Sequence, residues 1–278
     1  MKLFRHGATG QERPGLIDAQ GIYRDLSDVV DDITGATLTK QVQQRLRTLD
    51  TSRLPALPAA IRLGPCIAKV HNFIGLGLNF ADHAAEAKLP IPQHPLVFNK
   101  APTCIAGPHD PLIIPPGSHE LDYEVEMAVV LCQDAWQVSE AHALDYVGGY
   151  CLSNDFTDRY WQNHYAGQWT IGKSAPGFGP LGPWLVTADD IPNPGEIQLA
   201  LSVNQQRKQY ANTSGMIFNV AQVIAYISRF FRLSCGDVIT LGTPAGVGLA
   251  TGSYLKPGDK ITASGGILGE QHIQILPG

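Results

Sequence analysis

The chain has 278 residues, of which 44% are hydrophobic and 16% are charged, and its formal net charge is −5. This composition supports a large apolar core and excludes an intrinsically disordered protein. The negative charge, without a cluster of lysine and arginine among aromatic residues, excludes nucleic acid as an expected partner.

The five cysteines are scattered without a Cys-x-x-Cys pair, which argues against a disulfide framework and against a zinc site. The N-terminus is polar, and no apolar run approaches the roughly 20 residues that span a bilayer. We therefore expect a cytoplasmic protein with no membrane partner.

Residues 1–66 form the first predicted unit. Lys2–Arg5 is strand-like, and polar stretches compatible with helices cover Ser27–Val30 and Thr39–Leu49. The prolines of residues 54–58 break any helix, and a strand is expected next at Arg62–Ile67. The sequence therefore predicts a small N-terminal α/β domain over residues 1–66 and a larger catalytic domain over residues 67–278.

Short β-like runs separated by glycine- and proline-rich turns make up the second unit. The predicted strands are Asn72–Leu76, Leu96–Lys100, Glu124–Leu131, Leu199–Val203, Val238–Leu241 and Lys260–Ala263. The predicted helices are Ala81–Lys88 and Val220–Phe231. Because no helix regularly follows each strand, we expect an α+β chain with a mixed β fold and not a doubly wound parallel sheet.

Acidic and apolar residues alternate along Leu121–Val130, a run that otherwise reads as a buried strand. In a continuous strand, side chains two apart share a face, so Asp122, Glu124 and Glu126 are expected together. Buried carboxylates are costly without a compensating cation. We therefore predict a metal held by Glu124 and Glu126, and we place Asp122 outside the ligand set.

Asp155 follows a run of small residues at the start of a predicted loop. There it can complete a three-carboxylate site for Mg²⁺ or Mn²⁺ with Glu124 and Glu126. The alternative is that Asp155 caps the turn at residues 157–159. The neighbouring Glu-x-Glu strand favours the metal.

His83 and Glu86 are three residues apart on one face of a predicted helix. This spacing lets the carboxylate orient the imidazole as a general base. Surface His–Glu pairs are common and usually inert, so that alternative stays open. Gly75 and Gly77 precede the helix and indicate a lid that closes over a substrate.

Lys173 lies between a glycine and a serine, after Arg159 and Gln162. An isolated lysine is usually a solvated surface charge, but one beside a metal site can bind a substrate carboxylate or stabilise an enolate. The segment Leu241–Gly248 is predicted to be a tight turn. It would offer backbone N–H groups and the Thr243 hydroxyl to a small anionic substrate.

Six ordered motifs resemble the fumarylacetoacetate hydrolase family. They are Gly77–Glu86, Asp122–Glu126, Gly149–Asp155, Gly172–Ser174, Pro180–Trp184 and Gly242–Gly248. The N-terminal unit resembles the small N-terminal domain of bacterial members labelled ureidoglycolate lyase or diketo-deoxy-sugar-acid hydrolase. The resemblance implies a mixed β-roll fold with a small N-terminal α/β domain, and a homodimer.

The resemblance also implies roles for residues. Mg²⁺ or Mn²⁺ would be held by Glu124, Glu126 and Asp155; His83, Glu86 and Lys173 would be catalytic; and Asn79, Arg159, Gln162 and Thr243 would contact the substrate. Family members commonly carry an Asp-Thr pair after the Lys-Ser, where this chain has Ala175–Phe178. The analogy of substrate is weaker at that loop.

These inferences predict a metal-dependent enzyme of the acylpyruvate hydrolase type. It would hydrolyse a C–C bond of a 2,4-diketo acid to pyruvate and a second carboxylic acid. The favoured substrate is 2,4-diketo-3-deoxy-L-rhamnonate or its fuconate isomer, which would yield lactate. The alternatives at the same metal site are an oxaloacetate decarboxylase and a ureidoglycolate lyase. A non-catalytic binding protein is disfavoured, because the three ligands and the His–Glu pair occur together.

Overall fold

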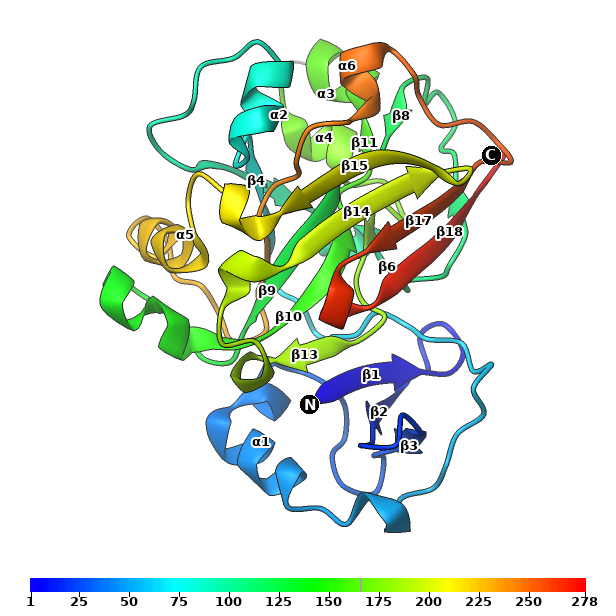
Figure 1. Ribbon diagram of the computed structural model, residues 1–278, viewed down its shortest axis with the longest axis vertical. Helices are drawn as coiled ribbons and strands as arrows, with labels where there is room; N and C mark the ends of the chain where they lie inside the picture. Colours follow the sequence, from blue (N-terminus) through cyan, green and yellow to red (C-terminus); the bar gives the residue numbers. More distant parts are fainter. Residues whose placement is uncertain (166) are drawn as a thin grey trace.

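A computed structural model describes residues 1–165 and 167–278 as an α+β chain (Figure 1). Its strands are β1 Lys2–His6, β2 Arg13–Ile17, β3 Tyr23–Asp25, β4 Phe73–Gly77, β5 Leu96–Lys100, β6 Ile105–Ala106, β7 Leu112–Ile113, β8 Leu121–Asp122, β9 Val125–Leu131, β10 Val147–Asn154, β11 Thr157–Asp158, β12 Gly179–Pro180, β13 Leu185–Thr187, β14 Gln198–Val203, β15 Gln206–Asn212, β16 Val238–Thr240, β17 Lys260–Ser264 and β18 Glu270–Leu276. Its α-helices are α1 Lys40–Arg47, α2 Ala81–Glu86, α3 Arg159–His164, α4 Trp169–Lys173, α5 Val220–Ile227 and α6 Gly248–Thr251.

A nine-stranded mixed sheet forms the centre of the molecule, in the order β3-β2-β1-β13-β10-β9-β16-β4-β5. Its two middle strands, β9 and β10, pair in antiparallel fashion and are buried along their whole length. The short strand β16 lies between β9 and β4 and runs parallel to β4. Such fully buried strands carry apolar side chains on both faces, so a polar residue in them needs a specific partner.

A second sheet of five strands, β15-β14-β17-β18-β7, covers one face of this centre, and β14 contacts β9. Its strands alternate: buried residues of β14 and β18 are separated by residues that are more exposed. This period of two is typical of a sheet that packs one face on a core and leaves the other to water. The apolar core therefore lies between the two sheets.

The N-terminal strands continue the central sheet. β1 pairs with β13, so that Lys2 lies opposite Val186. In Figure 1 this unit, with α1, lies at the bottom, while α2, α3, α4 and α6 gather at the top. The division at residue 66 stays a prediction. No helix in the described part of the chain has the length and apolar character to cross a membrane.

The mixed α+β fold expected from the sequence is confirmed. The predicted strand Leu96–Lys100 is observed with the same bounds, and Val220–Phe231 contains the shorter helix α5. Two predicted elements are not observed: Ser27–Val30 forms no helix, and Arg62–Ile67 forms no strand. The sequence also missed β10, because its Gly148-Gly149 pair has low strand propensity, and tertiary burial overrides that propensity.

The sequence predicted one continuous strand over the acidic run Leu121–Val130, and this prediction is wrong. It forms β8 and β9, and Tyr123 and Glu124 lie between them. Glu124 N–H donates to the side chain of Asn154 at 2.9 Å instead of joining a strand ladder. Asp122 accepts the N–H groups of Gly248 and Leu249, at 2.6 and 2.9 Å, which holds β8 toward α6. Glu124 therefore lies within the interruption, with Asp122 before it on β8 and Glu126 after it on β9.

Candidate active site

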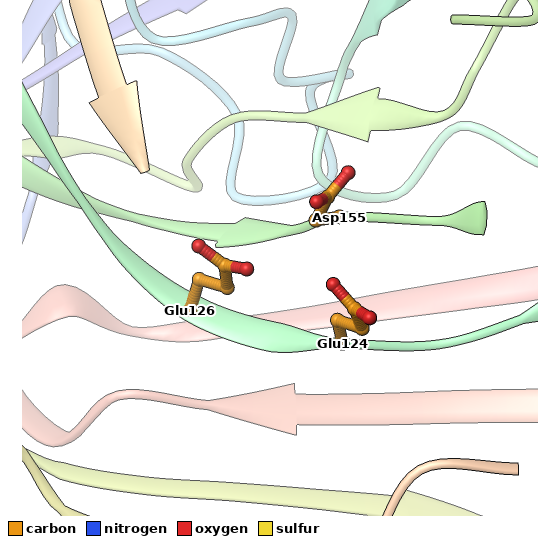
Figure 2. A group of neighbouring side chains, drawn as sticks. All are labelled: Glu124, Glu126 and Asp155. Atoms are coloured by element: carbon orange, nitrogen blue, oxygen red, sulfur yellow. The ribbon is translucent and has the colours of Figure 1, made fainter. Parts of the chain in front are cut away.

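Three carboxylates meet where β9 begins and β10 ends. Glu124, Glu126 and Asp155 each place a side-chain oxygen within 4.8 Å of the others, and all three are buried. In Figure 2, Glu124 and Glu126 project from the same ribbon, and Asp155 lies on the neighbouring one. Within residues 1–165 and 167–278, this is the group of acidic, histidine and cysteine side chains with the geometry of a metal site. Oxygen donors in this number suit Mg²⁺ or Mn²⁺.

Among the described residues, cationic side chains pair with Glu124 and Asp155 but not with Glu126. Its Oε2 accepts the N–H of Gly242 at 2.7 Å, but the buried Oε1 has no partner among the described residues. Burial raises the pKa of the Glu126 carboxyl well above its usual range, and the charges of Asp155 and Glu124 raise it further. A buried acceptor without a donor is the feature that a bound cation would resolve.

Glu124 has the opposite environment. Burial opposes its ionisation, but Lys173 and Arg159 outweigh that penalty and lower the pKa of the Glu124 carboxyl. Lys173 Nζ donates to Glu124 Oε2 at 3.0 Å and to Asp155 Oδ2 at 2.6 Å. The charges of Asp155 and Glu124 raise the pKa of Lys173 in spite of burial. Lys173 is therefore a protonated bridge between two of the proposed ligands.

Arg159 and Gln162 lie at the same end of the site, on α3. The Arg159 guanidinium donates to Asp122 at 2.8 Å, to Glu124 at 2.5 Å and to Gln162 Oε1 at 3.0 Å. Asp122 thus orients Arg159 and is not a member of the carboxylate triad, which agrees with its predicted place outside the ligand set. Fork-shaped donors of this kind fix the orientation of carboxylates.

Lys100 is a site residue that the sequence analysis missed. It ends β5 and is fully buried. Its Nζ donates to Asp155 Oδ1 and, at 3.0 Å, to the backbone carbonyl of Phe178. Each carboxylate oxygen of Asp155 therefore accepts a hydrogen bond from a lysine. The sequence shows a charged residue at the end of the predicted strand Leu96–Lys100, but no local pattern indicates that its partner is Asp155.

His83 and Glu86 meet on α2 as predicted, with His83 Nδ1 3.3 Å from Glu86 Oε2. Glu86 also accepts the N–H of Gly246, at 2.9 and 3.1 Å from its two oxygens. His83 is 8% exposed. A carboxylate fixed in this way favours the proton on Nδ1 and leaves Nε2 free to accept another. The pair is thus anchored, which distinguishes it from a mobile pair on the surface.

The turn after β16 differs from its predicted role. Its N–H groups were expected to receive an anionic substrate, but those of Gly242, Gly246 and Gly248 donate to protein carboxylates, namely Glu126, Glu86 and Asp122. The backbone groups of one turn therefore position three acidic side chains of the site. The prediction identified an anion-binding turn correctly in kind but assigned it the wrong anions.

Thr243 and Asn79 were predicted to contact the substrate, but their side chains form hydrogen bonds with other residues of the protein. The Thr243 hydroxyl donates to Val125 O at 2.9 Å and accepts Gln209 Nε2 at 2.8 Å. The Asn79 amide bonds to the backbone of Phe218 and Leu241. This geometry gives Asn79 a structural role.

Gln209, fully buried on β15, was missed by the sequence analysis. Its Oε1 accepts Val125 N–H at 3.0 Å, and its Nε2 donates to Thr243 Oγ1 and Pro244 O at 2.8 Å. Gln209 therefore ties the start of β9 to the turn that supports Glu86 and Glu126. No local pattern marks it, because its partners lie on other elements.

A cavity of about 150 Å³ opens at this end of the sheet. His83, Glu124, Arg159, Gln162, Lys173 and Thr243 contribute its polar lining, and leucines and aromatic rings contribute much of the rest. One member of the His–Glu pair, His83, and one member of the carboxylate triad, Glu124, thus line the same cavity, although they come from separate segments. Such a mainly apolar cleft with a few convergent polar groups is typical of a small-molecule site.

Residues 72–275 match the sequence profile of the fumarylacetoacetate (FAA) hydrolase C-terminal domain. The chain belongs to the fumarylacetoacetate hydrolase family. The matched region contains every residue that the sequence analysis assigned to the site. This confirms the resemblance drawn from the six motifs.

Relatives in this family cover almost the whole chain. A protein of Burkholderia multivorans with the provisional name hydrolase is 49% identical over 98% of this chain and 97% of its own length. A similar protein of Burkholderia ambifaria is 47% identical over the same shares of both chains. These relatives and the family indicate an enzyme of the hydrolase type.

Solved structures of the family have the same fold. The fumarylacetoacetate hydrolase of Exiguobacterium antarcticum is 31% identical, with a TM-score of 0.86 over 100% of both chains. A 2-hydroxyhepta-2,4-diene-1,7-dioate isomerase of Mycobacterium marinum is 28% identical, with a TM-score of 0.80 over 100% of this chain and 98% of its own. A maleylpyruvate hydrolase of Sphingobium, solved with Mn²⁺ and pyruvate, is 24% identical with a TM-score of 0.84 over 100% of both chains.

Proposed function

We propose that the chain hydrolyses the C3–C4 bond of acylpyruvates, a class of 2,4-diketo acids, in a metal-dependent reaction. The observation that carries this proposal is that one cavity is lined both by His83, which Glu86 anchors, and by Glu124, which belongs to the carboxylate triad. The first arrangement is suited to activating water, and the second is suited to holding a divalent cation. Hydrolysis of a diketo acid at this site would use both.

Glu124, Glu126 and Asp155 would hold the cation, and their donor set fits it, because Glu126 Oε1 is buried and has no partner in the part of the chain that the structure describes. A bound Mg²⁺ or Mn²⁺ would supply a Lewis acid beside the oxygens of the substrate. Lys100 and Lys173 hold Asp155 in place, and Arg159 holds Glu124. The chain's own cations thus orient the ligands before any ion arrives.

His83 would act as the general base. Its Nε2 takes a proton from water as the water oxygen attacks C4, while Glu86 holds Nδ1–H. The C3–C4 bond then breaks, and its electron pair leaves with C3 as the enolate of pyruvate. A proton returns to C3, and the products are pyruvate and the acid of the acyl group. Lys173 lines the cavity and favours the negative charge that develops on the enolate oxygen.

The substrate predicted from the sequence, 2,4-diketo-3-deoxy-L-rhamnonate or its fuconate isomer, is one member of this class. Its acyl group is lactoyl, so cleavage would release lactate with pyruvate. Oxaloacetate decarboxylation is the main competitor, because it also forms a pyruvate enolate but needs no activated water. A ureidoglycolate lyase would instead release urea and glyoxylate.

The test is pyruvate release from a panel of acylpyruvates by purified protein with Mn²⁺ or Mg²⁺, and again with EDTA. We expect turnover that EDTA abolishes. His83→Gln should lower kcat about 100-fold or more, the usual range for a lost general base. His142→Gln is the matched control, because His142 pairs with Asp145 at the same spacing on the surface, 3.6 Å apart. Equal loss in both variants, or no pyruvate from any acylpyruvate, would disprove the proposal.

Oxaloacetate separates the two enolate-forming activities. If His83→Gln stops acylpyruvate hydrolysis and leaves oxaloacetate decarboxylation intact, water activation by His83 is the step that distinguishes them.

We further propose that the chain acts as a homodimer, as its resemblance to the family implies. Light scattering on the protein as it elutes from a size-exclusion column should then give twice the mass of one chain.

A further inference from the structure

The cavity has two chemically distinct parts. Glu124, Lys173, Arg159 and His83 form its charged part. Beside the uncharged polar side chains of Gln162, Asn163 and Thr243, the rest of the wall is hydrocarbon and aromatic surface from Leu76, Ala87, Leu89, Phe98, Trp169 and Leu249. If the charged part receives the pyruvoyl half of an acylpyruvate, the acyl tail faces the apolar part.

The two basic side chains that line the cavity, Lys173 and Arg159, already form ion pairs with carboxylates of the protein. Lys173 binds Glu124 and Asp155, and Arg159 binds Asp122 and Glu124. Apart from His83, no other positively charged side chain lines the cavity among the residues that the structure describes. A second carboxylate at the far end of a substrate would therefore leave water without gaining a cationic partner, which is costly.

The aromatic wall is built into the fold. Trp169 and Phe98 are half-buried, and their ring centroids lie 5.4 Å apart. The Trp169 ring packs on Gly77, where an added Cβ would lie 2.5 Å from the ring. The Phe98 ring packs in the same way on Gly75 and would collide with a Cβ there. The glycines of β4 thus create the space that these rings fill.

We propose that the cavity selects acylpyruvates whose acyl tail is neutral and mostly hydrocarbon, and that it rejects those whose tail ends in a second carboxylate. This specificity rests on the proposed hydrolysis and names its substrate class. An apolar tail gains from leaving water against this wall, whereas a carboxylate loses its hydration.

A lactoyl tail falls between these extremes. A hydrophobic pocket discriminates only weakly, by about 100-fold at most, against an isostere that adds one hydroxyl. The sugar-acid substrate predicted from the sequence should therefore be cleaved, but with a lower kcat/KM than the acylpyruvate in which hydrogen replaces that hydroxyl.

A matched pair of substrates tests the proposal. Isocaproylpyruvate ends in two methyl groups where succinylpyruvate ends in two carboxylate oxygens, and the tails are otherwise the same. We expect kcat/KM, measured by pyruvate release with Mn²⁺, to be at least about tenfold higher for isocaproylpyruvate. Equal values, or a preference for succinylpyruvate, would overturn the specificity while upholding the hydrolysis. If neither compound yields pyruvate, the proposed hydrolysis itself fails.

A charge placed on the wall gives a second test. Leu89 lines the cavity and is 50% exposed, so Leu89→Lys should fold. Its ammonium would give a distal carboxylate a partner, and the preference for isocaproylpyruvate should fall about tenfold. Leu144→Lys is the control, because Leu144 is 47% exposed and lies outside this cavity. An unchanged preference in Leu89→Lys, or the same change in Leu144→Lys, would contradict the assignment.

Discussion

Glu126 has the least favourable environment of the acidic residues in the site. It is fully buried, one of its oxygens has no partner in the described chain, and two carboxylates lie beside it. The nearby lysines serve Asp155 and Glu124 instead. Without a metal, ionised Glu126 therefore opposes folding.

Glu126→Gln should stabilise the metal-free protein. The neutral amide keeps an acceptor for Gly242 N–H and supplies an N–H₂ group toward Glu124 and Asp155. In EDTA at about pH 8, we expect the free energy of unfolding to rise by roughly 1–3 kcal/mol, as measured by urea denaturation. The same variant should lose most of its affinity for Mn²⁺.

The pH dependence of this difference follows from the raised pKa of Glu126. A carboxyl whose pKa is higher in the folded state stabilises the fold while it is protonated, and that stabilisation is lost as the pH rises through the folded pKa. The variant and the wild type should therefore converge near about pH 4 and diverge above it. A gap that does not vary with pH, or an equal gain from Glu140→Gln on the surface, would argue against this explanation.

Among the elements, the turn Leu241–Gly248 does the most to assemble the site. Its N–H groups hold carboxylates from β9, α2 and β8. Gly246 makes this possible, because its φ is +109° and a Cβ there would collide with the Lys208 carbonyl of β15. Only glycine combines that backbone conformation with so close an approach.

Gly246→Ala should therefore disrupt both stability and activity. We expect a loss of about 3 kcal/mol or more in the free energy of unfolding, from steric strain and from displacement of Glu86. Gly252→Ala is the matched control, since its φ is also positive, at +66°, but no atom of the described residues lies within 4 Å of the added Cβ. It should cost about 1 kcal/mol. Thermal unfolding compares the two, and equal losses would show that the close contact has no special effect.

The sequence predicted those parts of the site that depend on local spacing. Glu124 and Glu126 are two residues apart in the chain, and His83 and Glu86 share a helical turn, so short-range spacing brings each pair together. Lys100, 55 positions before Asp155, and Gln209, on another sheet, could not be found this way. Their partners are set by how the sheets pack, which no local pattern encodes. The partners of the turn's N–H groups were missed for the same reason.

At the scale of the whole molecule, a bound metal should behave as a stabilising ligand. The triad joins β9 to the end of β10, in the middle of the larger sheet, so its cation would bind the folded chain and not the unfolded one. With Mn²⁺ at about 100 times its Kd, the free energy of unfolding should rise by roughly 2.7 kcal/mol. This corresponds to an increase in Tm of about 5 °C or more.

The shift should disappear in EDTA and in Glu126→Gln, because both remove the binding. Differential scanning calorimetry of wild type and variant, with and without Mn²⁺, provides the measurement. An equal rise in Tm for both proteins would place the ion somewhere other than the triad.

The central sheet also constrains the order in which a newly made chain can fold. β16 pairs with β4 on one side and with β9 on the other, and β1 pairs with β13. While the ribosome is still synthesising residues 1–237, β4 and β9 therefore lack the strand that joins them. Unpaired edges of this kind favour intermolecular pairing. We expect the yield of folded protein to depend on chaperones that shield the nascent chain until its last third has emerged.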